Sequence, residues 1–398
     1  MRVEFSPPDI SELEIAGVVN TLRSGWIVTG PKTKLFENKI AAYCGVPRVA
    51  CLSSATAALE LALRVLGVGP GDEVITSAYT YTASAAVIQH VGAKIVLVDT
   101  APGSYEMDPA RLEEAITERT KVVIPVDVGG VASEYRWIFD AVAKKKALFS
   151  PGDNVYQRLF NRVIVLADAA HSFGARYEGK VSGNLADFSC FSFHAVKSLT
   201  TAEGGAITWQ SYPGLDHEAL YREIMLLSLH GQTKDAFVKM RGGSWEYDIE
   251  TLGYKCNMTD IQAALGLSQL ARFEEMMMRR KKMAKAYDAL LPTQIERLEH
   301  FDGRRPGNAH LYMVRIPGVE ESRRNEIIQA MAREDIAVNV HFKPLPLFTA
   351  YKRLGFDIAM FPNAFAQYQN EMTLPLHSQL QERQVQYVAR TLRKIISK

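Results

Sequence analysis

Short, continuous runs of apolar residues alternate with segments of helical pattern between residues 47 and 209. Continuous apolar runs predict strands that are buried on both faces, and we expect these at residues 49–52, 73–76, 94–98, 121–126 and 162–167. Helices are expected between them, at residues 56–66, 82–91, 109–116 and 133–149. This alternation indicates an α/β fold whose mostly parallel central sheet has helices on both faces.

The pattern changes after Glu203, where helical segments dominate. A helix predicted over residues 259–290 has apolar residues on several sides, so we expect it to lie wedged between layers or domains. Strands are predicted at 311–316 and 337–342, with a charged helix at 322–334 between them and an amphipathic helix at 382–396 after them. We therefore predict two domains: a large α/β domain over residues 1–250 and a small C-terminal α+β domain over residues 251–398.

Residues 144–162 interrupt the alternation. The segment begins with three consecutive lysines and continues into a loop that contains proline, glycine, aspartate and asparagine. Because both features are typical of solvent-exposed chain, we interpret this segment as a surface excursion and not as a binding element.

Composition limits the classes of function. The chain has 398 residues, of which 47% are hydrophobic and 23% charged, with a net charge of +2, so neither nucleic acid nor a membrane surface is expected as a partner. The four cysteines form no Cys-x-x-Cys pair, which argues against a zinc site or a disulfide framework, and we expect no metal. With no secretion signal and no apolar run long enough to span a bilayer, we expect a cytoplasmic protein.

The strongest chemical signal is a lysine, Lys197, within the run Phe-Ser-Phe-His-Ala-Val-Lys at 191–197. Lysines at such junctions usually face solvent, but here the flanking residues are aromatic, small or hydroxyl-bearing, which favours a depressed pKa and Schiff-base chemistry. Asp168 ends an apolar strand, at the edge of a parallel sheet where ligands bind. Although an aspartate there could simply cap a turn, the pair predicts a pyridoxal phosphate site, with Asp168 at the pyridine nitrogen.

Weaker signals fit the same cofactor. Residues 53–58 are small and hydroxyl-bearing and lie between a strand and a helix, so their free N–H groups could hold a phosphate or simply begin the helix. Ser192 could add a hydroxyl to that phosphate or be an ordinary strand residue. Tyr81 follows a strand edge and is our candidate for stacking on the cofactor ring, although aromatic strand residues are mostly core.

These motifs together resemble the DegT–DnrJ–StrS aminotransferases, which are pyridoxal phosphate enzymes of fold type I. The resemblance covers nearly the whole chain, from residues 24–31 through the segments already described to residues 253–264 and 339–342. It implies a homodimer with shared active sites, in which a loop at residues 255–257 reaches into the partner's site.

The resemblance also implies a role for individual residues. Lys197 would bind the cofactor as a Schiff base and then shuttle the proton, and Asp168 would pair with the pyridine nitrogen. His171 would lie near the phenolic oxygen of the cofactor. The remaining cofactor-binding positions would be Ala55, Thr56 and Ser192 at the phosphate, Tyr81 on the ring, and Lys255 and Asn257 from the partner.

Lys255 and Asn257 stand where many members of the family have Asn and Arg, and this version resembles the subgroup that makes 4-amino-4-deoxy-arabinose on a UDP carrier. Asp127 stands where many members have His, and residues 144–162 are longer than usual. The resemblance implies transfer of an amino group from L-glutamate to a nucleotide-linked keto sugar, with the 4-ketone favoured, in amino-sugar and cell-surface polysaccharide biosynthesis. The alternatives are a 3-keto-sugar aminotransferase and a non-catalytic regulator that binds pyridoxal phosphate.

Overall fold

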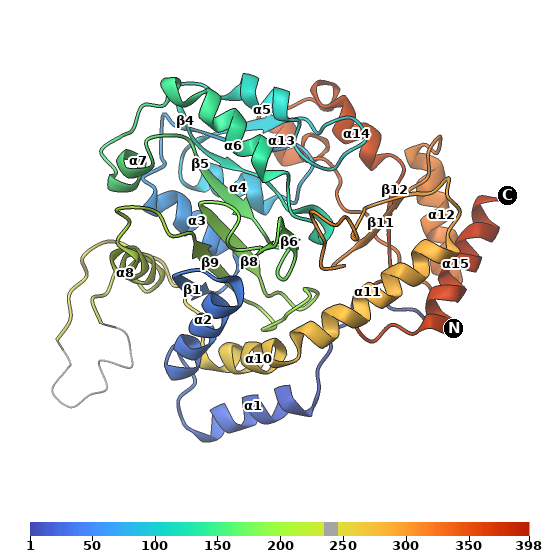
Figure 1. The fold of residues 1–398 in the computed structure, drawn as a ribbon, viewed down its shortest axis with the longest axis horizontal. Coiled ribbons are helices and arrows are strands. Elements are labelled where there is room, and N and C mark those ends of the chain that lie inside the picture. The colour runs from blue at the N-terminus through green and yellow to red at the C-terminus, as the bar shows by residue number, and fades with distance from the viewer. Residues whose placement is uncertain (235–245, 398) are drawn as a thin grey trace.

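A seven-stranded sheet forms the centre of the protein in a computed structural model, which describes residues 1–234 and 246–397 (Figure 1). Its spatial order is β1-β9-β8-β5-β4-β2-β3, and β9 runs antiparallel to both of its neighbours while the remaining pairs are parallel. The strands are β1 (Arg48–Leu52), β2 (Glu73–Ser77), β3 (Lys94–Val98), β4 (Thr120–Ile124), β5 (Ile164–Asp168), β8 (Phe188–Ser192) and β9 (Gly205–Trp209). The predicted mostly parallel α/β sheet is confirmed.

Helices cover both faces of this sheet. Alternate residues of β5 show why, since Ile164 and Leu166 pack into one apolar cluster with α3, α4 and α8, whereas Val165 and Ala167 pack into another with α5 and α6. The helices are α3 (Ala55–Val65), α4 (Ala83–His90), α5 (Pro109–Ala115), α6 (Tyr135–Lys144), α7 (Val155–Phe160) and α8 (His217–Ser228). Further short elements are the hairpin β6 (Arg176–Tyr177) and β7 (Lys180–Val181) and the 3₁₀ turns Val128–Gly130, Lys146–Leu148, Leu345–Leu347 and Ile358–Met360.

The prediction that residues 144–162 form a solvated excursion is wrong for the second half of the segment. There, α7 buries Tyr156 and Phe160 in the core, and the side chains of Asn154 and Gln157 donate hydrogen bonds to carbonyls at the end of α3. The helix predicted over 133–149 is also shorter, because α6 ends at Lys144 and a 3₁₀ turn follows. Polar residues that cap a neighbouring helix look like loop residues in the sequence.

The helix predicted over residues 259–290 is two helices, α10 (Asp260–Ala271) and α11 (Phe273–Leu290). Arg272 leaves the helical conformation between them, with φ −118° and ψ 12°. Its guanidinium is bound by Asp9 at 3.0 Å and by Glu14 at 2.7 Å, so contacts with the N-terminal segment stabilise the break. As expected for a helix that is apolar on several sides, α10 packs between other elements, here α1 (Glu12–Arg23) and α2 (Pro31–Cys44).

The C-terminal part contains a three-stranded antiparallel sheet in the order β10-β11-β12. Its elements are β10 (Glu296–Arg297), β11 (Tyr312–Arg315), α12 (Glu321–Arg333), α13 (Thr349–Arg353), α14 (Pro362–Tyr368), β12 (Glu371–Leu374) and α15 (Glu382–Ile396). The strand predicted at 337–342 is wrong, because this segment makes a single bridge, between Asn339 and Thr373, and the backbone N–H of His341 bonds to the side chain of Glu371. The pattern missed β12, and the division into two domains at residue 250 stays a prediction.

The first nine residues run along the C-terminal part before they reach α1. Val3 is buried and pairs with Ile336, and Ser6 donates a hydrogen bond of 3.2 Å to the carbonyl of Val196, next to Lys197. In Figure 1 both marked chain ends accordingly lie near α15. None of the helices in the described ranges is both long and apolar enough to cross a membrane.

Candidate active site

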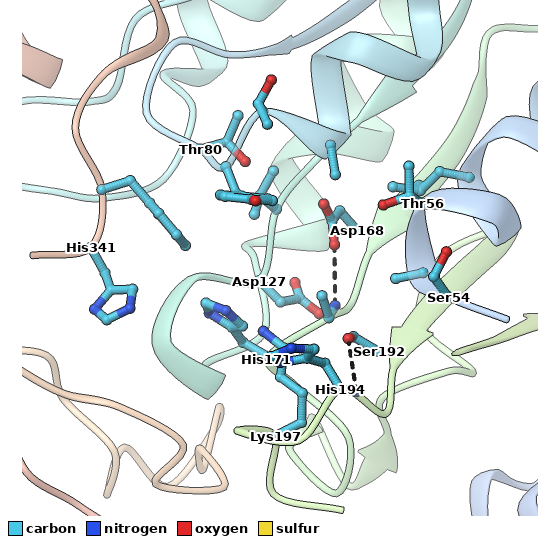
Figure 2. A pocket seen from close by; sticks show the side chains of 18 of the residues that line it. Ser54, Thr56, Thr80, Asp127, Asp168, His171, Ser192, His194, Lys197 and His341 are labelled. Carbon is cyan, nitrogen blue, oxygen red and sulfur yellow. Dashed lines mark hydrogen bonds between the residues drawn. The ribbon is translucent and has the colours of Figure 1, made fainter. Parts of the chain in front are cut away.

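A cavity of about 950 Å³ opens at the carboxyl edge of the large sheet, where the parallel strands end (Figure 2). The loops after β1, β2, β4, β5 and β8 line it on one side. Residues 339–343 line it on the other, together with Phe348, Ala350 and Tyr351. The cavity contains seven of the nine residues predicted for the site: Ala55, Thr56, Tyr81, Asp168, His171, Ser192 and Lys197. The fold therefore gathers residues that lie up to about 140 positions apart in the sequence.

Lys197 lies in the loop that follows β8, and its side chain lines the cavity beside the imidazole groups drawn in Figure 2. The loop turns tightly, since the N–H of Lys197 donates to the carbonyl of His194 at 2.9 Å. Burial lowers the pKa of Lys197 to about 8, and the nearby carboxyl of Asp168 partly opposes this shift. At pH 7 about a tenth of this amine is therefore unprotonated and nucleophilic, far more than of an ordinary lysine, as Schiff-base chemistry requires.

Asp168 is the last residue of β5 and is 6% exposed. Its carboxylate accepts a hydrogen bond of 2.6 Å from the hydroxyl of Ser84 and one of 3.2 Å from the N–H of Ala170. Burial raises the pKa of Asp168, while these two donors and Lys197 act in the opposite direction. A buried carboxylate is stabilised by a cation beside it, and a protonated pyridine nitrogen in the cavity would supply one.

His171 has a tautomer that the backbone determines. The N–H of Gly129 donates to its Nδ1 at 3.2 Å, so Nδ1 is an acceptor and the proton is on Nε2. Burial lowers the pKa of His171 well below its usual value, which keeps the ring neutral. The side chain of Asn308 donates to the carbonyls of His171 and Phe173 and so fixes the loop. His171 can therefore present one N–H donor.

The start of α3 forms the other end of the cavity. Ser54 caps the helix, and its hydroxyl accepts from the N–H of Ala57 at 3.0 Å, which leaves the N–H groups of Ala55 and Thr56 at the helix N-terminus. Gly205 packs against this turn so closely that a Cβ atom there would lie 2.3 Å from Ser54 and 2.4 Å from Ala55. A helix N-terminus with free N–H groups and with hydroxyls beside it is suited to a phosphate.

Tyr81 lies at the rim of the cavity, with 62% of its surface exposed. The centroid of its ring is 6.3 Å from that of Phe342, on the opposite side. Its position is compatible with stacking on a planar ring in the cavity, and this role stays a prediction.

Lys255 and Asn257 are not among the residues that line the large cavity. Their side chains bond to each other, and Asn257 also donates to the hydroxyl of Thr29 at 2.6 Å. Asn257 lines a second cavity of about 570 Å³, together with Lys34. In a single chain these two residues are thus separate from Lys197, so their predicted role depends on a second copy of the protein.

Sequence reasoning missed two polar groups that support the site. Ser84 gave no signal because serine is common at helix starts, yet it holds Asp168. Asp127, singled out only as a departure from the family pattern, lines the cavity and accepts hydrogen bonds from Tyr135 at 2.9 Å and Ser172 at 2.6 Å. Burial raises the pKa of Asp127 to about 6. His341 lies within residues 339–342, which carry part of the family resemblance, but the resemblance implies no role for it.

The residues of the cavity fit pyridoxal phosphate. A buried carboxylate, an amine of lowered pKa and a helix N-terminus suited to a phosphate lie around a space of suitable size. A sheet of this topology with such a site defines a pyridoxal phosphate-dependent transferase.

Comparison with known proteins agrees with this class. The model of the DegT/DnrJ/EryC1/StrS aminotransferase family matches residues 8–393, so the chain belongs to that family and is a pyridoxal phosphate-dependent aminotransferase. It is 39% identical to the spore coat polysaccharide biosynthesis protein SpsC of Bacillus subtilis, over 98% of this chain and 96% of the relative. It is 37% identical to a UDP-4-amino-4-deoxy-L-arabinose–oxoglutarate aminotransferase of Shewanella sediminis, over 86% of this chain and 84% of the relative.

A solved structure is similar over the whole chain. The putative sugar aminotransferase Spr1654 of Streptococcus pneumoniae, in its PMP form, superposes with a TM-score of 0.97 at 52% identity, covering 100% of this chain and 99% of that one. Its PLP form gives a TM-score of 0.96 at 51% identity with the same coverage. These forms carry the two states of the cofactor between which an aminotransferase alternates.

Proposed function

We propose that this enzyme is a sugar aminotransferase that moves an amino group from L-glutamate to a nucleotide-linked keto sugar. The observation that carries the proposal is the placement of Lys197 and Asp168 together in the cavity of about 950 Å³, which is roomy enough for a cofactor and a sugar. The names of the relatives support a sugar acceptor, and the arabinose-type relative favours a ketone at position 4. The SpsC relative supports a place in polysaccharide biosynthesis.

Bound pyridoxal phosphate supplies an electron-withdrawing ring that stabilises negative charge on the substrate carbon. The chain supplies the remaining functions. Asp168 would hold positive charge on the pyridine nitrogen, and the start of α3 with Ser192 would bind the phosphate. Lys197, with a pKa of about 8, would accept a proton from the α carbon of the amino donor and deliver it to the aldehyde-derived carbon of the cofactor. His171 would donate a hydrogen bond from Nε2 to the phenolic oxygen of the cofactor.

The proposal includes a homodimer in which Lys255 and Asn257 complete the site of the partner. Its support is that these residues lie away from Lys197 in their own chain, beside a second cavity. Sedimentation of the protein, and mixing of a Lys197→Ala chain with a Lys255→Ala chain, would test it. Shared sites predict that the mixed dimer recovers one working site, whereas a self-contained site predicts no recovery.

Absorbance spectroscopy tests the reaction. Glutamate should bleach the absorbance of the lysine-bound cofactor, and one member of a panel of 3-keto and 4-keto nucleotide sugars should restore it. A 3-keto sugar as the restoring member would favour the alternative 3-keto-sugar aminotransferase. Failure of glutamate to bleach the band would favour a non-catalytic regulator, and failure of every keto sugar to restore it would exclude the proposed acceptors.

A further inference from the structure

A chain of hydrogen bonds leads from a buried carboxyl group to the wall of the cavity. Thr373 and Glu371 lie two residues apart on β12, and the hydroxyl of Thr373 is 2.6 Å from Oε1 of Glu371. The same hydroxyl is 2.9 Å from Nδ1 of His341. Glu371 and Thr373 are fully buried, whereas His341 lines the cavity (Figure 2). Side chains two apart on a strand share one face, which explains the alignment of the pair.

The geometry determines which atoms can exchange protons. The backbone N–H of His341 donates to Oε2 of Glu371 at 2.8 Å, so Oε1 is the oxygen that faces Thr373. Since Nδ1 of His341 is engaged by Thr373, the other ring nitrogen, Nε2, is left for a ligand. No group in residues 1–234 or 246–397 hydrogen-bonds to Nε2.

A hydroxyl has one proton to donate, and this allows two arrangements of the chain. When Glu371 is a carboxylate, Thr373 donates to it and accepts from Nδ1–H of His341, which leaves Nε2 as a bare acceptor. When Glu371 is a carboxylic acid, it donates to Thr373, Thr373 donates to Nδ1, and Nε2 carries the proton. The protonation of a buried group thereby sets the hydrogen-bonding character of the cavity wall.

We propose that Glu371 and Thr373 are positioning residues that act through His341, setting whether its Nε2 donates or accepts a proton in the cavity. In one passage, the N–H bond at Nε2 breaks as its proton moves to a ligand oxygen. The hydroxyl proton of Thr373 then moves to Nδ1, and the carboxyl proton of Glu371 moves to Thr373. Glu371 ends as a carboxylate, no electrons are exchanged, and the reverse passage restores the starting state.

This device suits the amination of a ketone, because the ketone oxygen leaves as water and must take up protons. That use rests on the proposed function. The relay itself depends only on residues of this chain, so it can be examined without substrate.

The surroundings of the Glu371 carboxyl group are compatible with its gaining and losing a proton. Burial raises the pKa of Glu371 to about 8, opposed by its hydrogen bonds and by Arg324. The guanidinium of Arg324 donates to the backbone carbonyls of Tyr368 and Glu371 and leaves the carboxyl to Thr373. Tyr79 and Tyr105 also lie near the carboxyl, and burial raises the pKa of both phenols so that they stay neutral.

Other charged and titratable groups lie beside Glu371 and beside His341. Arg315 is opposite Glu371 on β11 and is paired with Glu296. At the cavity, burial and Lys197 lower the pKa of His341 to about 4, so its ring is neutral and exists as one tautomer or the other. The neighbouring rings of His171 and His310 are held neutral in the same way.

Nitrogen-15 NMR of histidine-labelled apoenzyme tests the proposal, because the two neutral tautomers have different ring-nitrogen shifts. His341→Gln identifies the resonance. The wild type should change from Nε2–H below pH 8 to Nδ1–H above it. Glu371→Gln should stay Nε2–H from pH 6 to 9, since its amide oxygen can accept from the backbone of His341 while its NH₂ group donates to Thr373. Thr373→Val should remove the pH response and Thr373→Ser should restore it.

Thr208→Val is the matched control, because it removes a buried threonine hydroxyl from β9, where that group donates to the carbonyl of Gly183 at 2.8 Å. It should leave the tautomer of His341 and its pH response unchanged. A wild-type tautomer that is constant from pH 6 to 9, or a Glu371→Gln variant that titrates like the wild type, would overturn the relay. These results are independent of the acceptor: if no keto sugar is aminated, the proposed function fails while the tautomer data still decide on the relay.

Discussion

The two sides of the cavity hold their histidines by different means. On the sheet-edge side, formed by Lys197, Asp168 and His171, the backbone N–H of Gly129 fixes the tautomer of the ring. On the C-terminal side, formed by His341, Thr373 and Glu371, a hydroxyl and a carboxyl contact the ring. A backbone N–H group can only donate a hydrogen bond, whereas a hydroxyl group can both donate and accept one. The tautomer of His171 on the first side is therefore fixed. On the second side, the proposed relay would let Nε2 of His341 change between hydrogen-bond donor and acceptor.

The largest effect is expected from Lys197→Ala on the sheet-edge side. Loss of the amine removes both the attachment of the cofactor and the proton carrier, so amino transfer should fall by at least about 10³-fold. Single-turnover absorbance measures the loss. Borohydride reduction of the wild-type holoenzyme, followed by peptide mass analysis, should place the cofactor on Lys197. Lys180→Ala, at an exposed position on β7, is the control and should retain full activity; cofactor found on another lysine would contradict the assignment.

Asp168→Asn should have the next largest effect. The amide keeps the shape and still accepts from Ser84, but it cannot hold positive charge on the pyridine nitrogen, so kcat should fall by about 10²-fold to 10³-fold. Asp99→Asn is a matched control, since Asp99 is also a buried carboxylate but binds the N–H groups at the start of α14. If both variants lost activity equally, the effect of Asp168 would be structural.

The pH dependence of Lys197 in the apoenzyme gives a smaller effect. Its lowered pKa means that the neutral amine accumulates as the pH rises through about 8, so its rate of acylation should level off above that pH. Ordinary lysines continue to gain reactivity toward their pKa near 10.4. Because Asp168 raises the pKa of Lys197, Asp168→Asn should move the midpoint to lower pH. Peptide mass analysis after brief labelling follows the acylation of Lys197 alone. If the midpoint were the same in the wild type and in Asp168→Asn, the charge of Asp168 would have no effect on the pKa of Lys197.

The smallest effect is on stability, and it concerns the C-terminal side. Glu371 has a folded-state pKa of about 8, above its ordinary value of 4.5, so its contribution to stability is complete below pH 4.5 and is lost as the pH rises toward 8. Glu371→Gln removes this loss. The free energy of unfolding of the variant should therefore rise relative to that of the wild type as the pH increases through this window. Urea unfolding at several pH values measures the gain. If the free energies of unfolding of the wild type and of Glu371→Gln changed with pH in parallel, Glu371 would not titrate in this range.

The sheet and its edge were predictable because both depend on local patterns. Continuous apolar runs predicted five of the seven strands of the large sheet, β1 to β5, and Asp168 is the last residue of one of them. They did not predict β8, and Lys197 lies in the loop that follows this strand. The C-terminal side was not predictable, since His341 and Glu371 are 30 residues apart and meet through a segment that resembles a strand but pairs at one residue. Arg272 likewise ends a helix through contacts with residues more than 250 positions earlier, which no helical periodicity records.

The path of the first nine residues has a practical consequence for preparing the protein. Val3 is buried against the C-terminal part, Ser6 bonds to the backbone beside Lys197, and Asp9 binds Arg272. A shortened chain that begins after these residues would lose contacts with both the loop that contains Lys197 and the junction of α10 and α11. Crystallisation variants should therefore retain this segment, and affinity tags are better placed after α15, where Ser397, the last described residue, is exposed.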